Sequence, residues 1–359
     1  MDEYREIAYL VTADGIRFVS LKHGAAPSPI VPKGLNGARI VGISSLGRGP
    51  FALGLSDGRV MPAEIRFTAS FPDGQRQVDA EFLEGDPIRV DPDTRPILRL
   101  AHVVAPTGPI TAAAVGSKEV VLVTVTATNA LIGPSTKEES RQRFSLPIDG
   151  EITALALDGR GENLFVGTSS GQVLRAALQD SITVTVAETI AAASRPGTGV
   201  NIMGLLIGDR TLVVGDASGG VSSWQLLRSN GGEQRLTRIY EFDSHSRPVV
   251  AFAPSGRDKG FITADASGTS HLYYGTTGKP CSRSKLKRAA PKRSPLPLKP
   301  MASSPLIRPD GWRTGPSRTR ILKLPGRPCS ARSGMKGIPL RSTSGNPRVE
   351  PMTLKRSSA

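Results

Sequence analysis

Two pentapeptides place a serine where it could act as a nucleophile. The strings "GLSDG" (54–58) and "GTSSG" (167–171) match the pattern Gly-x-Ser-x-Gly, in which a strained strand-to-helix turn presents a serine hydroxyl. A related string, "GDASG" (215–219), recurs with alanine at the central position, and a strand-like run follows each string. We therefore interpret Ser56 and Ser169 as turn residues and predict no catalytic residue.

The histidines give no sign of a metal site. His23, His102, His245 and His271 are the only four, and no two of them have the spacing of metal ligands. No glycine-rich phosphate loop is present either, so we predict no metal, no cofactor and no enzymatic activity. His245, in "DSHSRPV", is expected to be a structural histidine held within a turn of the fold.

The elements that would position these residues form a repeat. Five segments each carry a short apolar run, a polar turn that ends in glycine and an alternating run, which together indicate a β-hairpin. They are 7–21, 51–65, 164–178, 212–227 and 261–275, with turn glycines Gly15, Gly58, Gly171, Gly219 and Gly268.

The spacing of the repeat favours a propeller. Gly15 to Gly58, Gly171 to Gly219 and Gly219 to Gly268 are 43, 48 and 49 residues apart, and segment 109–129 fits a sixth, degenerate unit. Units of this length, with a further strand before most hairpins, are typical of four-stranded propeller blades. The predicted fold is therefore all-β, a WD40-like β-propeller with six recognisable blades of an incomplete seven.

Charge divides the chain into two regions. From residue 279 onward, 81 residues hold 20 Lys and Arg but only two acidic residues, whereas residues 1–278 hold 26 basic and 29 acidic residues. We predict a propeller region over 1–278 and a disordered basic tail over 279–359. Such a tail could bind nucleic acid or another anionic surface, but Trp312 is its only aromatic residue, so base stacking has little support.

Several strings in the body resemble one family. The matching strings are "DEYREIAYLVTADG" (2–15), "FALGLSDGRV" (51–60), "VDPDTRPILRLA" (90–101), "AVGSKEVVL" (114–122) and "DSHSRPVVAFAPSGRDKGFITADASG" (243–268). They are similar to the WD40-like propeller of long bacterial permease subunits of phosphate ABC transporters. The resemblance covers about residues 2–278 and implies an accessory, non-catalytic module that lies on the periplasmic side of the inner membrane.

The resemblance also implies partners and a departure from the family pattern. The intact relatives work with a second permease, an ATPase and a phosphate-binding protein. This sequence contains neither a signal peptide nor an apolar run long enough to span a membrane, so we expect a propeller truncated at both ends, without transport activity and cytoplasmic by default. A stand-alone interaction scaffold whose basic tail binds an anion remains the alternative.

The composition of the tail suggests a frameshift. Synonymous codons for residues 280–304 can be chosen so that the frame one base away encodes a string resembling the start of a seventh blade. The same operation on residues 332–358 gives a string resembling the segment that joins propeller and permease in that family. We therefore expect a change of reading frame near Gly278 or Lys279.

Overall fold

The computed structural model describes residues 7–20, 26–44, 49–128, 136–179, 183–228, 232–278 and 280–285. These residues form β-strands and two single-turn 3-10 helices, η1 (Lys33–Leu35) and η2 (Pro72–Gly74). Among them, no helix has the length and apolar character needed to cross a membrane. The predicted all-β class is confirmed.

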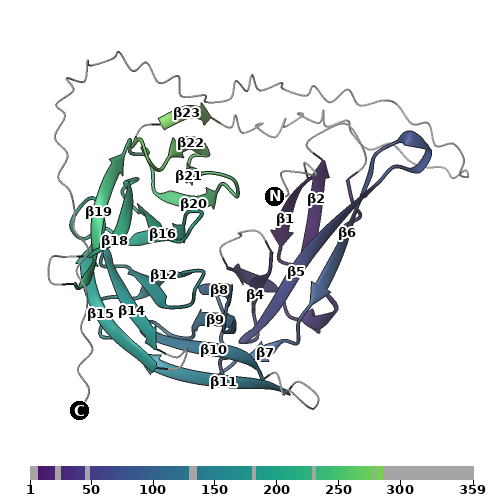
Figure 1. The fold of residues 1–359 in the computed structure, drawn as a ribbon, viewed down its shortest axis with the longest axis horizontal. Helices are drawn as coiled ribbons and strands as arrows, with labels where there is room; N and C mark the ends of the chain where they lie inside the picture. Colours follow the sequence, from purple (N-terminus) through teal and green to yellow (C-terminus); the bar gives the residue numbers. More distant parts are fainter. Residues whose placement is uncertain are drawn as a thin grey trace, which may run out of the picture. The chain divides into compact units, whose positions relative to one another are not determined.

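The strands form one hairpin followed by five antiparallel sheets, which succeed one another along the chain (Figure 1). In four of the sheets, four strands pair in chain order. The first sheet after the hairpin, β3-β4-β5-β6, has a short fifth strand, β7, beside β5. This topology is that of propeller blades.

The strand bounds are as follows. The hairpin is β1 (Ile7–Thr12) and β2 (Gly15–Ser20). The first blade is β3 (Ile40–Ile43), β4 (Phe51–Leu55), β5 (Arg59–Ser70), β6 (Gln77–Glu84) and β7 (Ile88–Arg89), and the second is β8 (Leu100–Ala105), β9 (Gly108–Ala114), β10 (Glu119–Thr128) and β11 (Thr136–Ser145). The third blade is β12 (Ile152–Leu157), β13 (Asn163–Thr168), β14 (Gln172–Gln179) and β15 (Thr183–Ala191), the fourth is β16 (Val200–Leu205), β17 (Thr211–Asp216), β18 (Val221–Arg228) and β19 (Gln234–Phe242), and the fifth is β20 (Val249–Pro254), β21 (Gly260–Asp265), β22 (Thr269–Tyr274) and β23 (Pro280–Lys285).

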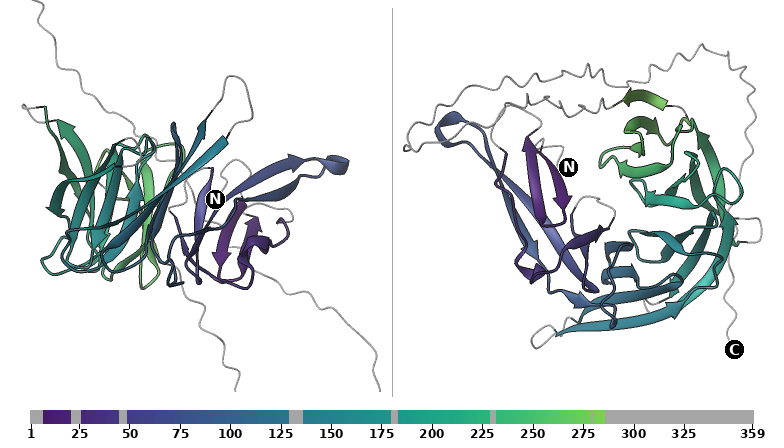
Figure 2. Two further views of the ribbon diagram at one scale, coloured as in Figure 1. Left: turned by 90° about the horizontal axis from the view of Figure 1, so that it is seen from below. Right: turned by 180° about the vertical axis from the view of Figure 1, so that it is seen from behind.

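The six predicted units therefore comprise five blades and one hairpin. The unit at 7–21 is the hairpin β1–β2, which a single bridge between Ile16 and Ile30 extends. The long hairpin β5–β6 continues beyond its shorter neighbour β4, because β4 pairs with β5 only up to Ala63 (Figure 2).

The core lies between consecutive sheets. One apolar cluster joins the hairpin β1–β2 to blade β3–β7, and four more join each blade to the next. The second strands β13 and β17 are buried at every position, since a neighbouring blade covers each of their faces. This explains why their sequences read as continuous apolar runs and do not alternate.

Four of the five predicted turn glycines have positive φ angles. Gly58, Gly171, Gly219 and Gly268 lie at φ 81°, 87°, 95° and 84°, in the region that favours glycine. Gly15 does not have this conformation. It opens β2, where the Cβ of any other residue would collide with the carbonyl oxygen of Ile30.

The last blade extends past the predicted domain boundary at residue 278. Its fourth strand, β23, covers Pro280–Lys285 and pairs with β22 from Thr269 to Tyr273. Backbone hydrogen bonds make such a ladder, so an outer strand forms without an apolar pattern. The rest of the predicted basic tail, residues 286–359, lies outside the described residues.

Candidate interaction site

The two candidate nucleophiles serve the blade turns. The Ser56 Oγ accepts a hydrogen bond from the Arg39 N–H at 3.0 Å, and the Ser169 Oγ accepts one from the Glu151 N–H at 2.9 Å. Each hydroxyl thus links the turn to the start of its own blade. A strand follows each turn, β5 after Ser56 and β14 after Ser169, in place of the helix of a nucleophile elbow.

His245 is buried in the last blade. Its Nε2 lies 2.7 Å from the Thr263 Oγ1, its Nδ1 lies 3.5 Å from the Asp265 Oδ2, and its ring stacks on His271 at 4.0 Å. Burial and the neighbouring His271 lower the pKa of His245, although Asp265 acts in the opposite direction, so the neutral imidazole is favoured. The ring therefore packs and bonds within the blade, as a structural histidine does.

The preceding blade repeats this construction with other residues. Asp216 ends β17 as Asp265 ends β21, and it accepts hydrogen bonds from the backbone N–H groups of Ser218 and Gly220. Ser194 takes the place of His245, and its N–H and Oγ donate to the Asp216 Oδ2 at 2.7 and 2.6 Å. The turn carboxylates thus connect each blade to the loop that leads into it.

His102 lies in β8, where its Nδ1 is 2.8 Å from the Thr111 Oγ1. Burial lowers the pKa of this histidine to about 4 from its ordinary value of 6.5. His23, the fourth predicted histidine, lies outside the described residues.

We expect the free energy of unfolding to fall as the pH drops from 7.5 to 5, because the unfolded chain takes up a proton at His102 that the folded chain excludes. The loss due to His102 is about 2 kcal/mol at pH 5 and levels off below pH 4. Urea unfolding at pH 7.5 and at pH 5 should show that the free energy of unfolding falls less in His102→Gln than in the wild type. An equal loss in the variant and the wild type would contradict this assignment.

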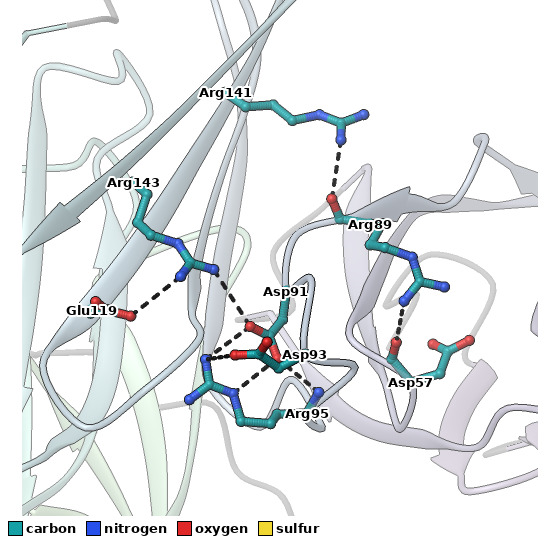
Figure 3. Close-up of polar contacts among 8 residues, drawn as sticks. All are labelled: Asp57, Arg89, Asp91, Asp93, Arg95, Glu119, Arg141 and Arg143. Carbon is teal, nitrogen blue, oxygen red and sulfur yellow. Dashed lines mark hydrogen bonds and ion pairs between the residues drawn. The ribbon is translucent and has the colours of Figure 1, made fainter.

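A buried carboxylate connects blade β3–β7 to blade β8–β11 (Figure 3). Asp91 follows β7, and its side chain is fully buried. Its Oδ2 accepts hydrogen bonds from the Arg95 N–H and Nε at 2.8 and 3.0 Å, while its Oδ1 accepts one from the Arg95 Nη2 at 2.9 Å. The Arg143 Nη2, from β11, reaches the same Oδ1 at 3.5 Å.

Further contacts surround this carboxylate (Figure 3). Arg143 also pairs with Glu119 of β10 at 3.6 Å, and the Arg141 Nη1 donates to the Arg89 carbonyl oxygen at 3.2 Å. Hydrogen bonds from Arg95 lower the pKa of Asp91 in spite of its burial. Because its charges are paired with one another, this network has a structural role and leaves no reactive group free.

A pocket of about 390 Å³ opens between blades β12–β15 and β16–β19. Its apolar lining includes Phe165, Leu212 and Trp224, and its rim carries Arg210 and Arg228. The sequence did not indicate this site, because its residues come from five strands and two loops. The complete lining is Asp158, Arg160, Glu162, Asn163, Phe165, Leu205, Gly208, Asp209, Arg210, Leu212, Trp224, Leu226, Arg228, Gln234 and Leu236.

Some charged side chains of the pocket have hydrogen-bond partners, and others have none. The two Asp158 oxygens accept hydrogen bonds from the Glu162 N–H and the Asn163 amide at 2.8 and 2.7 Å. Burial, together with the Asp158 carboxylate, raises the pKa of Asp209. Within the described part of the chain, the side chains of Arg210 and Arg228 form no hydrogen bond or ion pair, so the rim offers two exposed guanidinium groups beside an aromatic floor.

The described residues hold no cluster of three or more His, Cys, Asp or Glu side chains suited to a metal ion. No protein-family model and no curated protein match the chain.

Solved structures, however, do match it. One is the Swd1 (Cps50) β-propeller domain of Myceliophteria thermophila, at 13% identity and a TM-score of 0.53, covering 79% of this chain and 85% of that one. This chain has a WD40-like β-propeller fold. Another is Sqt1 of Chaetomium thermophilum bound to the N-terminus of ribosomal protein L10, at 16% identity and a TM-score of 0.46, covering 76% and 67%. At 13% identity the match with the Swd1 domain shows the fold alone.

Proposed function

We propose that this chain is a non-catalytic propeller module that binds another protein. The observation that supports this proposal is the pocket between blades β12–β15 and β16–β19, whose lining includes Trp224 and two arginines, Arg210 and Arg228, with unpaired side chains. Aromatic and arginine side chains dominate the binding energy of protein interfaces, and a guanidinium recognises a carboxylate with two parallel hydrogen bonds. The pocket therefore suits an acidic residue beside an apolar one on the partner.

We further propose that the intact protein is a phosphate ABC-transporter permease subunit, with this propeller as its accessory periplasmic module. The support is the series of strings from 2–15 to 243–268, which resemble that family in the same order. The partner would then be another subunit of the transporter, and the phosphate-binding protein is the one that shares the periplasm with the propeller.

Biolayer interferometry tests both proposals. It measures whether the purified phosphate-binding protein, the ATPase or the second permease binds to the full chain. We expect one subunit to bind, and the dissociation constant to rise at least about tenfold in Arg210→Glu/Arg228→Glu. Arg39→Glu is the matched control, because Arg39 is 69% exposed and lies outside the pocket. If no subunit binds, the transporter proposal is wrong, and equal binding by all variants would exclude the pocket.

The basic tail supports a second candidate, an interaction scaffold that binds nucleic acid or another anion. Twenty basic residues in 81 would release many counterions on binding, so the affinity would fall steeply with salt. Filter binding over a salt series, with and without residues 286–359, separates this candidate from the first, because this deletion leaves the last blade complete. Steep salt dependence that disappears on deletion supports the scaffold, and its absence favours the transporter module.

A further inference from the structure

The last blade leaves one of its faces uncovered. Ile262 of β21 and Leu272 of β22 are directly paired, so they lie side by side on one face, and they are 46% and 37% exposed. Val250 of β20 is 53% exposed. The opposite face of the same strands is buried, with Phe261 and Tyr273 packed against blade β16–β19. We call the exposed residues Val250, Ile262 and Leu272 the C-terminal face.

Earlier blades bury the corresponding positions. Counting from the turn glycine of each blade, Ile262 is equivalent to Val213 of β17 and to Phe165 of β13, which are 0% and 2% exposed. Val213 clusters with residues of the blade that follows it, and so does Phe165. The C-terminal face is thus the face that contacts a following blade everywhere else in this chain.

The N-terminal hairpin leaves the complementary face uncovered. Ile7, Ile16 and Phe18 pack against blade β3–β7, whereas Leu10 and Val19 point to the other side and are 61% and 54% exposed. We call Leu10 and Val19 the N-terminal face. It is the face that a preceding blade would cover. The described blades therefore expose one half of an inter-blade interface on the N-terminal hairpin and the other half on the last blade.

We propose that these two faces bind each other between copies of this chain, with the C-terminal face of one molecule on the N-terminal face of the next. Within one chain the faces do not cover each other, since their side chains are exposed. The contact would continue the blade-to-blade packing that recurs along the chain. Residues 286–359 are a poor alternative cover because their sequence lacks the apolar alternation of blade strands.

The arrangement predicts head-to-tail association, because each face meets a different one. Sedimentation velocity of the full chain at several concentrations should show species larger than the monomer. Ile262→Asp and Leu10→Asp each place a charge in one face, and we expect each to raise the dissociation constant at least about tenfold. Val104→Asp is the matched control, because Val104 is 51% exposed and belongs to neither face.

Mixing the two variants gives the decisive result. Ile262→Asp keeps an intact N-terminal face and Leu10→Asp keeps an intact C-terminal face, so the mixture should form heterodimers although neither variant self-associates. Circular dichroism of each variant checks that the fold is retained. A wild type that stays monomeric, association that both substitutions leave unchanged, or a mixture that does not pair would each overturn the proposal.

Discussion

Replacing Arg175 with alanine is expected to lower the free energy of unfolding by about 3–5 kcal/mol. Arg175 lies in β14 with 9% of its side chain exposed, and its Nε donates to the Glu188 Oε1 of β15 at 2.8 Å. Its Nη1 donates to the Asn163 Oδ1 at 3.1 Å, and its Nη2 to the Gln234 carbonyl oxygen of the next blade at 2.9 Å. The variant leaves the partly buried Glu188 without its cation, and urea unfolding at pH 7 will measure the loss.

A double substitution separates the charge from the packing. Glu188 also accepts a hydrogen bond from the Leu236 N–H, which a glutamine at position 188 can still accept. We therefore expect Arg175→Met/Glu188→Gln to be more stable than Arg175→Ala, because no buried charge is left unpaired and the methionine retains much of the side-chain volume. If the double variant is the less stable of the two, neither the unpaired charge nor the lost volume explains the loss in Arg175→Ala.

Asp91→Asn is expected to lower the free energy of unfolding by about 3 kcal/mol, measured in the same way. The amide has the shape of the carboxylate, but its NH₂ group would face the donors of Arg95. The side chains of Arg95 and Arg143 are 47% and 39% exposed. The expected loss of stability therefore lies at the lower end of the range for breaking a buried ion pair. Asp93→Asn should cost less than about 1 kcal/mol, because Asp93 is 68% exposed.

The effect of Asp91→Asn should depend on pH. The pKa of Asp91 is lowered in the folded chain, so its contribution is fully present above the ordinary aspartate pKa of 3.8 and is lost as the pH falls through the folded value. The difference between the wild type and Asp91→Asn should accordingly shrink below pH 4. A difference that stays constant at low pH would show that shape and not charge explains the loss.

The sequence predicted the inner part of each blade better than its outer edge. Segments such as 164–178 and 212–227 show both the apolar runs and the turn glycine, and their ends match those of the hairpins β13–β14 and β17–β18 to within one residue. The outermost strands are harder to recognise. The sequences of β11, "TKEESRQRFS", and β23, "PCSRSK", carry no apolar alternation, because backbone pairing with one inner neighbour is enough to form an edge strand.

Neither the interaction site nor the contacts between blades could be predicted from local patterns. Arg175 reaches the Gln234 carbonyl across 59 positions of sequence, and Arg143 reaches Asp91 across 52. Such pairs depend on the packing of one blade on the next, which single-strand periodicity does not encode. The sequence signals that did point to chemistry, the serines of 54–58 and 167–171, belong to turns whose hydroxyls bond to backbone amides.

Our proposal that this propeller belongs to a phosphate-transporter permease subunit is tested most directly by the nucleotide sequence of its gene around codons 270–359. We predict that the frame one base away stays open past codon 278 and encodes a seventh blade followed by membrane-spanning segments of a permease. Stop codons in that frame, or an open frame that encodes neither, would contradict the proposal.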